Sequence, residues 1–225
     1  ENFLEKKEQV NQLKQEMMLE TVEEDLQEMM QNIENGVSRT AEIVKELRTF
    51  SRVDEAAKKR VYIHEGIRSI LVIMRSQYKN DIEIEVDFAE LPQVECFPGK
   101  INQVVMNILQ NAIQSTLEKK AALAPEPFTP QVTIKTYLEK ITPNPENDSQ
   151  TVEGICIEIS DNGKGVHSTV KDKIFDPFFT TKDVGKGVGL GLSISMSIME
   201  QHQGFIHLHD RQGSGAIFKI LLPLS

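Results

Sequence analysis

The stretch NQVVMNILQNAIQS, residues 102–115, is the most informative part of this 225-residue chain. Its apolar residues recur at three- and four-residue steps, which predicts an amphipathic helix. Asn107 and Asn111 lie four residues apart and therefore share one face of that helix. Because asparagine is a poor helix former, two in mid-helix are either tolerated at an exposed surface or have a function. The functional interpretation is a pair of amide oxygens directed at a hard cation such as Mg²⁺.

Shorter segments on both sides of this helix predict a mixed α+β domain. Strands are expected at residues 60–63, 81–88, 93–97, 131–139, 153–160, 204–210 and 215–222. Helices are expected at 65–78, 100–120 and 190–203, and Pro98 suits the first turn of the second. Because helices and strands are mixed and the last strands are adjacent in sequence, we predict a sandwich with one mixed sheet and helices on one face.

The first 53 residues have a different composition, with no proline and one glycine. Thr21 and Glu24 form a capping box, and apolar residues at three- and four-residue steps after it predict a helix running to about Arg52. A weaker pattern between residues 3 and 17 predicts an antiparallel partner helix, with one continuous coiled coil as the alternative. We therefore expect a helical hairpin over 1–57 and a second domain over 58–225.

Charge and cysteine content exclude several classes of function. A net charge of −9 argues against a nucleic-acid surface, although a few local cations and backbone N–H groups are enough for a small anion. Cys96 and Cys156 both lie in apolar, strand-like runs, which favours two buried free thiols and a reducing cytoplasm over a disulfide. No apolar run approaches the length of a membrane span, so any membrane contact is expected through an upstream segment.

A first glycine-containing segment, EISDNGKGV, follows a predicted strand at residues 158–166. Asp161 lies at the carboxyl end of the strand, and Gly163 and Gly165 come directly after it. This pattern fits a simple turn. It equally fits a carboxylate that accepts a hydrogen bond from an exocyclic amine while the glycines admit a planar ring.

A second glycine-rich segment, GKGVGLGLS at residues 185–193, runs into a predicted helix. It is not a Walker loop, because Lys186 is followed by Gly187 and not by Ser or Thr, and its spacing does not fit the dinucleotide pattern. Backbone N–H groups at a helix N-terminus favour an anion. The phenylalanines before it, at 175, 178 and 179, are expected to pack a loop onto the domain.

Taken together, these segments resemble the ATP-binding domain of the sensor histidine kinases, within the GHKL group that includes gyrase, mismatch-repair and heat-shock chaperone ATPases. Five segments occur in the family's order across about residues 58–225. They are NQVVMNILQNAIQS, DNGKGV, IFDPFFTTK, GKGVGLGLSIS and GSGAIFKILLP, which are similar to the N box, the first glycine box, the phenylalanine box and the second and third glycine boxes. The form FFTTK points to the kinases in particular.

The resemblance implies a site for ATP and Mg²⁺. Asn111 would be the principal Mg²⁺ ligand with Asn107 in support, and Asp161 would bind the adenine amino group. Residues 167–188 would form a mobile lid, with Lys182 near the phosphates and catalytic together with the two asparagines. The implied nucleotide-binding residues are Asn107, Asn111, Asp161, Gly163, Gly165, Phe178, Thr180, Thr181, Lys182, Gly187, Val188, Gly189, Leu190 and Gly191.

Four residues depart from the family pattern. Val188 replaces a threonine of the second glycine box, and Ala216 stands where the third box often has threonine. Gln114 and Ser115 replace the lysine and the aromatic residue common after the N-box asparagine. These departures bear on nucleotide affinity more than on the fold.

The family phosphorylates itself on a histidine in the first helix of a dimeric hairpin, and residues 1–63 contain no histidine. The segment 35–55 resembles the second helix of that hairpin, whereas His64 lies beyond it and lacks the proline of the acceptor motif. We therefore expect the acceptor to lie upstream, so that this chain alone does not label itself. The histidines of the terminal strands are expected to be structural or solvated.

The resemblance thus implies the catalytic portion of a cytoplasmic, homodimeric histidine kinase. It would transfer the γ-phosphoryl group of ATP to the upstream histidine, for relay to an aspartate of a response regulator. The alternatives are a degenerate kinase that binds nucleotide without autophosphorylation and an interaction module with a vestigial site. Asn107 stands where a hydrolysing GHKL ATPase would need a general-base glutamate, which argues against hydrolysis.

Overall fold

A computed structural model of the chain describes residues 3, 6–8, 21–22, 24–34, 36–37, 40, 57–78, 81–142, 151–182, 187–211 and 214–224. The chain divides into two compact units. One consists of Glu1–Arg48 with Thr181–Val188, and the other of Thr49–Thr180 with Gly189–Ser225. The second unit contains every strand described below.

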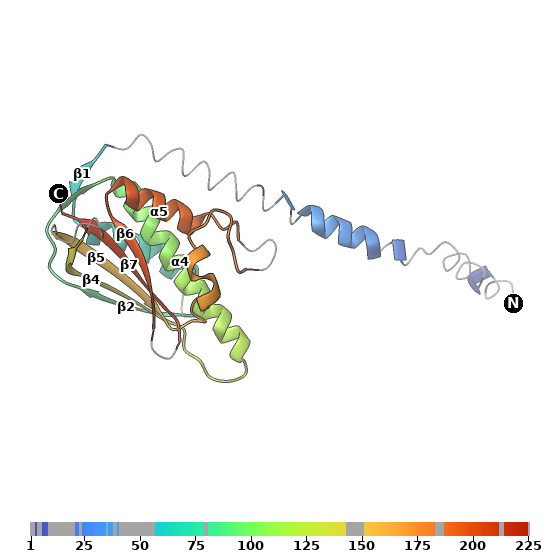
Figure 1. The fold of residues 1–225 in the computed structure, drawn as a ribbon. Helices are drawn as coiled ribbons and strands as arrows, with labels where there is room; N and C mark the ends of the chain where they lie inside the picture. The colour runs from blue at the N-terminus through green and yellow to red at the C-terminus, as the bar shows by residue number, and fades with distance from the viewer. Residues whose placement is uncertain are drawn as a thin grey trace. The chain divides into compact units, whose positions relative to one another are not determined.

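In the N-terminal region, residues 21–22, 24–34, 36–37 and 40 are helical, in agreement with the helix predicted to start at Thr21 (Figure 1). Large apolar side chains on this helix are exposed in the single chain. They are Val22, Leu26, Met29, Met30, Ile33 and Val37. The predicted antiparallel hairpin and its alternative, a continuous coiled coil, depend on segments that lie outside the described residues.

The second unit is built on a five-stranded sheet in the order β2-β4-β5-β7-β6 (Figure 1). The strands are β2 (Glu83–Phe88), β4 (Gln131–Ile141), β5 (Val152–Asp161), β6 (Phe205–Asp210) and β7 (Ala216–Pro223). β2 pairs with β4 in parallel, and all other pairs are antiparallel. The predicted α+β fold with a mixed sheet is confirmed.

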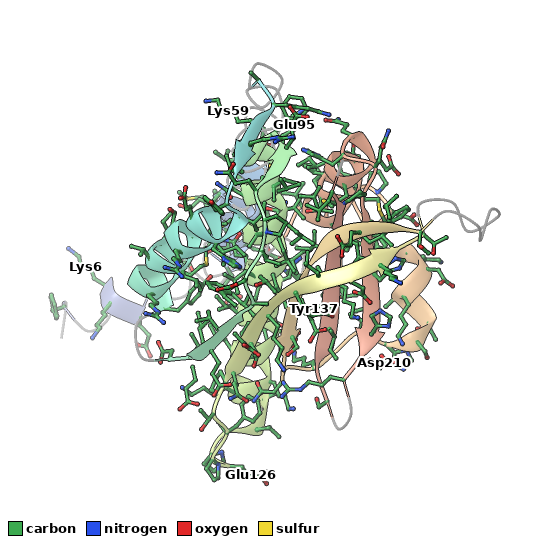
Figure 2. The ribbon with its side chains drawn as sticks, turned by 90° about the vertical axis from the view of Figure 1, so that its left-hand side faces the viewer. Lys6, Lys59, Glu95, Glu126, Tyr137 and Asp210 are labelled. Carbon is green, nitrogen blue, oxygen red and sulfur yellow. The ribbon has the colours of Figure 1, made fainter. Side chains whose placement is uncertain are left out.

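Two short strands do not join this sheet. β1 (Lys59–Val61) and β3 (Val94–Cys96) pair with each other in antiparallel fashion, with Val61 opposite Val94. Figure 2 shows Lys59 and Glu95 close together at one end of the unit. The strands predicted at these positions are therefore correct, but they form a separate two-stranded sheet and not part of a single one.

Three α-helices form the second layer: α3 (Ile63–Tyr78), α4 (Pro98–Leu123) and α5 (Gly191–Gln201). α4 and α5 cross the same face of the sheet (Figure 1). The apolar face of α4 is fully buried, with Val104, Ile108 and Ile113 each 0% exposed. These residues share one core with α3, α5 and the inner side chains of the strands. None of the helices in the described ranges combines the length and apolar character of a membrane span.

Strand alternation separates this core from the outer face of the sheet. On β4, Val132, Ile134 and Thr136 are buried, whereas Tyr137 alternates with them and its hydroxyl donates to Glu158 at 2.9 Å. This alternation is the expected result of the two-residue period of a strand.

Both cysteines are buried and free, as predicted. Burial raises the pKa of the Cys96 thiol to about 11 and that of Cys156 to about 12. Such thiols remain protonated and unreactive near neutral pH.

Candidate nucleotide-binding site

Asn107 links the middle of α4 to the start of α5. Its Nδ2 donates to the Gly191 carbonyl at 3.1 Å and to Ser195 Oγ at 3.3 Å. Ser195 Oγ in turn donates to the same carbonyl at 2.8 Å. Because the amide nitrogen is committed to α5, the carbonyl oxygen of Asn107 is the atom that can bind a cation or a water.

Asn111 follows one turn later on α4 and is half-buried, as Asn107 is. The apolar residues beside it, Ala112 and Ile113, are buried in the core. The two amides therefore lie at the edge of the buried face of α4. Neither asparagine is exposed, as the simpler interpretation of their spacing, two residues tolerated at an exposed surface, would require.

Asp161 ends β5 with only 2% of its surface exposed. Its Oδ1 accepts a hydrogen bond from the Gly163 N–H at 2.8 Å. Burial raises the pKa of this carboxyl above its ordinary value, and backbone donors together with the cations of Arg211 and Lys119 oppose that effect. A buried carboxylate with one oxygen held by its own loop is suited to accept a further hydrogen bond from a ligand.

The loops of the first and third glycine boxes pack backbone to backbone. Gly215 has a φ of +104°, and a Cβ on it would lie 1.9 Å from the Asp161 carbonyl oxygen. A side chain there would push the two loops apart. The third glycine box therefore supports the position of Asp161, a role that the sequence did not indicate.

α4 also holds the first glycine box beyond Asn111. Ser115 Oγ accepts a hydrogen bond from the Lys164 N–H at 3.1 Å, and Lys119 Nζ donates to the Asn162 carbonyl at 2.8 Å. In the sequence, Ser115 is a departure from the family pattern, and no motif marks Lys119. The available signal was spacing, because Ser115 and Lys119 continue the four-residue steps of Asn107 and Asn111.

The segment predicted as a lid begins with the 3₁₀ helix η2 (Ser168–Lys173). Phe175 and Phe179 pack against the core, as expected. Phe178 does not, because it is 64% exposed and its φ is +66°, a left-handed conformation that a non-glycine residue rarely adopts. The prediction of a packed phenylalanine cluster is therefore correct for two of the three rings.

The second glycine box leads into an uncapped helix. Gly189 has a φ of +75°, and a Cβ on it would lie 2.5 Å from the Phe179 carbonyl oxygen. Leu190, the N-cap of α5, gives no side-chain hydrogen bond to the first turn. The first N–H groups of α5 have no such cap to satisfy them, so the turn can receive an anion.

The contacts described above do not include the remaining predicted site residues. Thr181, Lys182, Gly187 and Val188 belong to the other compact unit, and residues 183–186 lie outside the described ranges. Val188 is only 4% exposed, so its methyl groups occupy a buried position where a hydroxyl would need a partner. The nucleotide-binding roles of these residues stay predictions, as does that of Thr180.

His64 has a structural environment. Its Nε2 is hydrogen-bonded to Thr136 Oγ1 at 2.8 Å, and its ring stacks on Phe88 with centroids 4.5 Å apart. Burial and the nearby Arg68 cation lower its pKa. The ring therefore fastens α3 to the sheet, which agrees with the expectation that His64 is not the phosphoacceptor.

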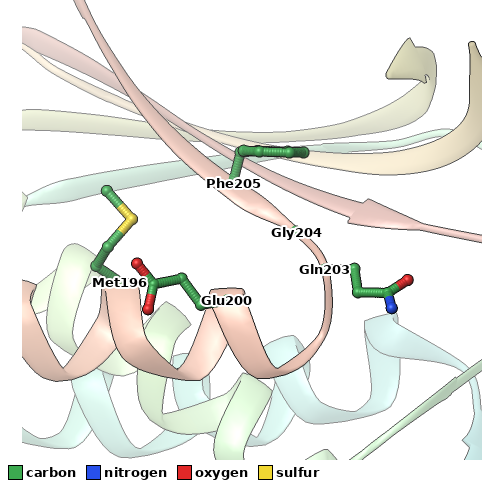
Figure 3. Close-up of a pocket in the computed structure, with 5 residues that line it drawn as sticks. All are labelled: Met196, Glu200, Gln203, Gly204 and Phe205. Atoms are coloured by element: carbon green, nitrogen blue, oxygen red, sulfur yellow. The ribbon is translucent and has the colours of Figure 1, made fainter. Parts of the chain in front are cut away.

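A surface hollow lies outside the candidate nucleotide site, at the C-terminal end of α5. It is lined by Met196 and Glu200 of α5, Gln203, Gly204, and Phe205 of β6 (Figure 3). Gly191 lies at the other end of the same helix, so the hollow is separate from the candidate site.

Residues 98–225, more than half of the chain, match the family described as "Histidine kinase-, DNA gyrase B-, and HSP90-like ATPase". The chain belongs to this family. The match covers α4, α5 and the loops of the three glycine boxes. These segments include Asn107, Asn111, Asp161 and Gly191. The resemblance inferred from the five sequence segments is thereby confirmed.

Sensor kinases are among the relatives of this chain. The chain is 31% identical to sensor kinase CckA of Brucella abortus over 85% of its own length and 20% of that protein. It is 28% identical to sensor histidine kinase ZraS of Escherichia coli K12 over 88% of its length and 38% of that protein. The chain thus spans between a fifth and two fifths of these relatives.

Solved structures of the same ATPase family have the same fold. The catalytic domain of histidine kinase ThkA aligns with a TM-score of 0.58 and 27% identity, covering 74% of this chain and 95% of that one. A mycobacterial sensor histidine kinase, MprB, aligns with a TM-score of 0.56 and 26% identity over 74% of this chain and 97% of that one. These domains correspond to most of this chain.

Proposed function

We propose that this chain is the ATP-binding catalytic portion of a sensor histidine kinase. The observation that carries the proposal is the bond from Asn107 to Gly191. It fastens the helix with the two asparagines to the uncapped first turn of α5. The asparagine amides of α4, which suit Mg²⁺, are thereby linked to the first N–H groups of α5, which suit phosphate. Binding of Mg-ATP requires both kinds of group in one place.

The residues present fit both adenine nucleotide and metal. The buried Asp161 carboxylate suits the adenine amino group, and the first turn of α5 suits phosphate oxygens. Asn111 and the carbonyl oxygen of Asn107 are hard ligands of the kind that Mg²⁺ prefers. When bound, Mg²⁺ would neutralise charge on the transferring phosphoryl group. The contribution of the chain is to bind, orient and shield the nucleotide.

The acceptor in this proposal is a histidine upstream of residue 1, on the first helix of a dimerisation hairpin. The exposed apolar side chains between Val22 and Val37 support a dimer partner for the second helix of that hairpin. From the histidine, the phosphoryl group would pass to an aspartate of a response-regulator receiver domain. The whole protein would act in the cytoplasm, with membrane contact only through an upstream segment.

Calorimetry with Mg-ATP tests the binding half of the proposal. The chain should bind Mg-ATP, and both Asp161→Asn and Asn111→Ala should weaken binding by about tenfold or more, since each removes a charged or metal-linked interaction. Gln110→Ala is the matched control, because Gln110 is exposed on the same helix. An unmodified chain that binds no Mg-ATP would identify the interaction module with a vestigial site.

Labelling with γ-labelled ATP tests the transfer half. The chain alone should remain unlabelled, whereas a separate hairpin with the acceptor histidine should gain an acid-labile label when mixed with it. Binding of Mg-ATP without any transfer to the kinase's own hairpin would identify the degenerate kinase instead.

A further inference from the structure

Lys119 joins both loops that flank Asp161. It lies on α4, two turns beyond Asn111, and its Nζ donates to the Asn162 carbonyl at 2.8 Å and to Ser214 Oγ at 2.9 Å. Ser214 Oγ donates in turn to the Gly163 carbonyl at 2.6 Å. One ammonium group therefore holds the first glycine box against the third.

Other contacts leave these loops little freedom. The side chain of Asn162 is occupied elsewhere, since its Oδ1 accepts from the Gln131 N–H and its Nδ2 donates to the Thr129 carbonyl, both at 2.9 Å. Gly215 packs directly on the Asp161 carbonyl. The Asp161–Gly163 turn is thus held on one side by β4 and on the other by Lys119 and its partner Ser214.

Lys119 also acts on Asp161 through its charge. Two cations from different elements lower the pKa of the buried Asp161 carboxyl: Lys119 on α4 and Arg211, which follows β6. Nη1 of Arg211 is buried and has no hydrogen-bond partner among the described residues. The positive charge of the two side chains therefore offsets part of the cost of keeping a carboxylate ionised in the core.

The neighbouring lysine shows that this arrangement is not a general property of the helix surface. Among the described residues, Lys120 makes an exposed ion pair with Asp81, at 3.7 Å, in which the two side chains are 45% and 70% exposed. Lys119 instead makes two hydrogen bonds to half-buried partners and lies over the Phe128 ring, 4.8 Å from its centroid.

We propose that Lys119 is a positioning residue of the adenine pocket, which fixes the two loops beside Asp161 and supplies positive charge to its carboxylate. The inference rests on the proposed binding of adenine nucleotide at Asp161. It adds a residue of this chain that acts through Asp161 without contact to the nucleotide. Loss of Lys119 should then impair recognition of the 6-amino group of adenine more than binding of the triphosphate.

The test compares two nucleotides on the full chain. Calorimetry would measure Mg-ATP and the Mg complex of purine riboside triphosphate, which lacks the 6-amino group, on Lys119→Met, Lys119→Arg and Lys120→Met. Lys119→Met should weaken the binding of Mg-ATP by about tenfold, which corresponds to the loss of one charge-assisted hydrogen bond. It should weaken the binding of the analogue by much less. Lys119→Arg should keep most of the ATP affinity, and Lys120→Met all of it.

The pH dependence of ATP affinity gives a readout that a purely structural role would not move. Affinity should fall as acid protonates Asp161, and the midpoint of that fall should lie at higher pH in Lys119→Met than in the unmodified chain. Lys119→Arg, which keeps the charge, should leave the midpoint unchanged. Melting temperatures of the variants would show that each remains folded at the temperature of the measurement.

Three results would overturn the inference. In the first, Lys119→Met weakens both nucleotides equally, which would assign Lys119 to the triphosphate. In the second, Lys119→Met has the same ATP affinity as the unmodified chain, with the same midpoint in its pH dependence. In the third, Lys119→Arg loses as much affinity as Lys119→Met. An unmodified chain that binds neither nucleotide would refute the proposed function itself, so the two failures are distinguishable.

Discussion

At the scale of single residues, His202 shows how a histidine can serve as a neutral connector. Its Nδ1 donates to the Ile198 carbonyl at 2.7 Å, and its Nε2 accepts from the Phe97 N–H at 3.1 Å. The ring therefore joins the C-terminal end of α5 to the start of α4. The second hydrogen bond requires a lone pair on Nε2, so it exists only while the ring is neutral.

This geometry predicts a pH dependence of stability. Burial, with Lys58 and Lys100 nearby, lowers the pKa of His202 below its ordinary value of 6.5, so the unfolded chain binds a proton more readily than the folded one. The contribution of His202 is then complete above pH 6.5 and declines as the pH falls through the folded pKa. The free energy of unfolding, measured with urea at pH values from about 5 to 8, should show this loss of stability as the pH falls.

The control is His202→Gln, which removes the titrating ring. Its free energy of unfolding should depend less on pH in the acid range than that of the unmodified chain. Some dependence should remain, because the pKa values of His64 and His207 are lowered as well. An identical pH profile in both proteins would show that protonation of His202 has no effect on folding.

At the scale of elements, the sequence predicts where each helix and strand lies better than it predicts which strands pair. The strand predicted at 153–160 is Val152–Asp161, and the helix predicted at 100–120 is Pro98–Leu123. Periodicity and end signals are local properties, so they can be found in one sequence. The pairing of β1 with β3 was not predicted, because pairing depends on packing between segments far apart in the chain.

The same contrast between local signals and long-range contacts applies to the candidate site. Motif spacing alone is enough to propose Asn107, Asn111 and Asp161 as site residues. The link from Asn107 to Gly191 joins residues 84 positions apart and the one from Lys119 to Ser214 joins residues 95 apart, so both required the fold. Phe178 was expected to pack inward, and its exposure results from a left-handed backbone that composition does not reveal.

The contact between the glycine-box loops yields a prediction about stability. Gly215→Ala should destabilise the fold by about 1–3 kcal/mol, because its Cβ would meet the Asp161 carbonyl and its φ of +104° suits glycine alone. Mg-ATP affinity should fall with it, since the same shift displaces Asp161. Urea denaturation and calorimetry on one preparation would measure both.

Gly99→Ala is the matched control for that substitution. Gly99 lies in the first turn of α4, and a Cβ there would meet no atom within 4 Å. Because alanine is the better helix former, this variant should be as stable as the unmodified chain or more stable by up to about 1 kcal/mol. Equal behaviour of the two alanine variants would contradict the packing argument.

At the scale of the whole molecule, the N-terminal helix has an apolar stripe that the described residues do not cover. Leu26, Met29, Ile33 and Val37 recur at helical spacing and are each more than half exposed. An isolated helix gains little stability without a partner for its apolar stripe, whereas the ATP-binding unit has a complete core of its own. In the proposed dimer, the partner chain would therefore stabilise the N-terminal helix, whereas the second unit already packs around its own core.

This difference predicts that dimerisation and nucleotide binding can be separated. Leu26→Glu should weaken self-association by about tenfold or more, because a bundle interface would have to bury an unpaired charge. Gln27→Glu, which adds the same charge beside the stripe, should associate as the unmodified chain does. Sedimentation velocity over a concentration series would measure association, and calorimetry should show equal Mg-ATP affinity in all three proteins. Equal self-association of Leu26→Glu and Gln27→Glu would show that this stripe is not the dimer interface.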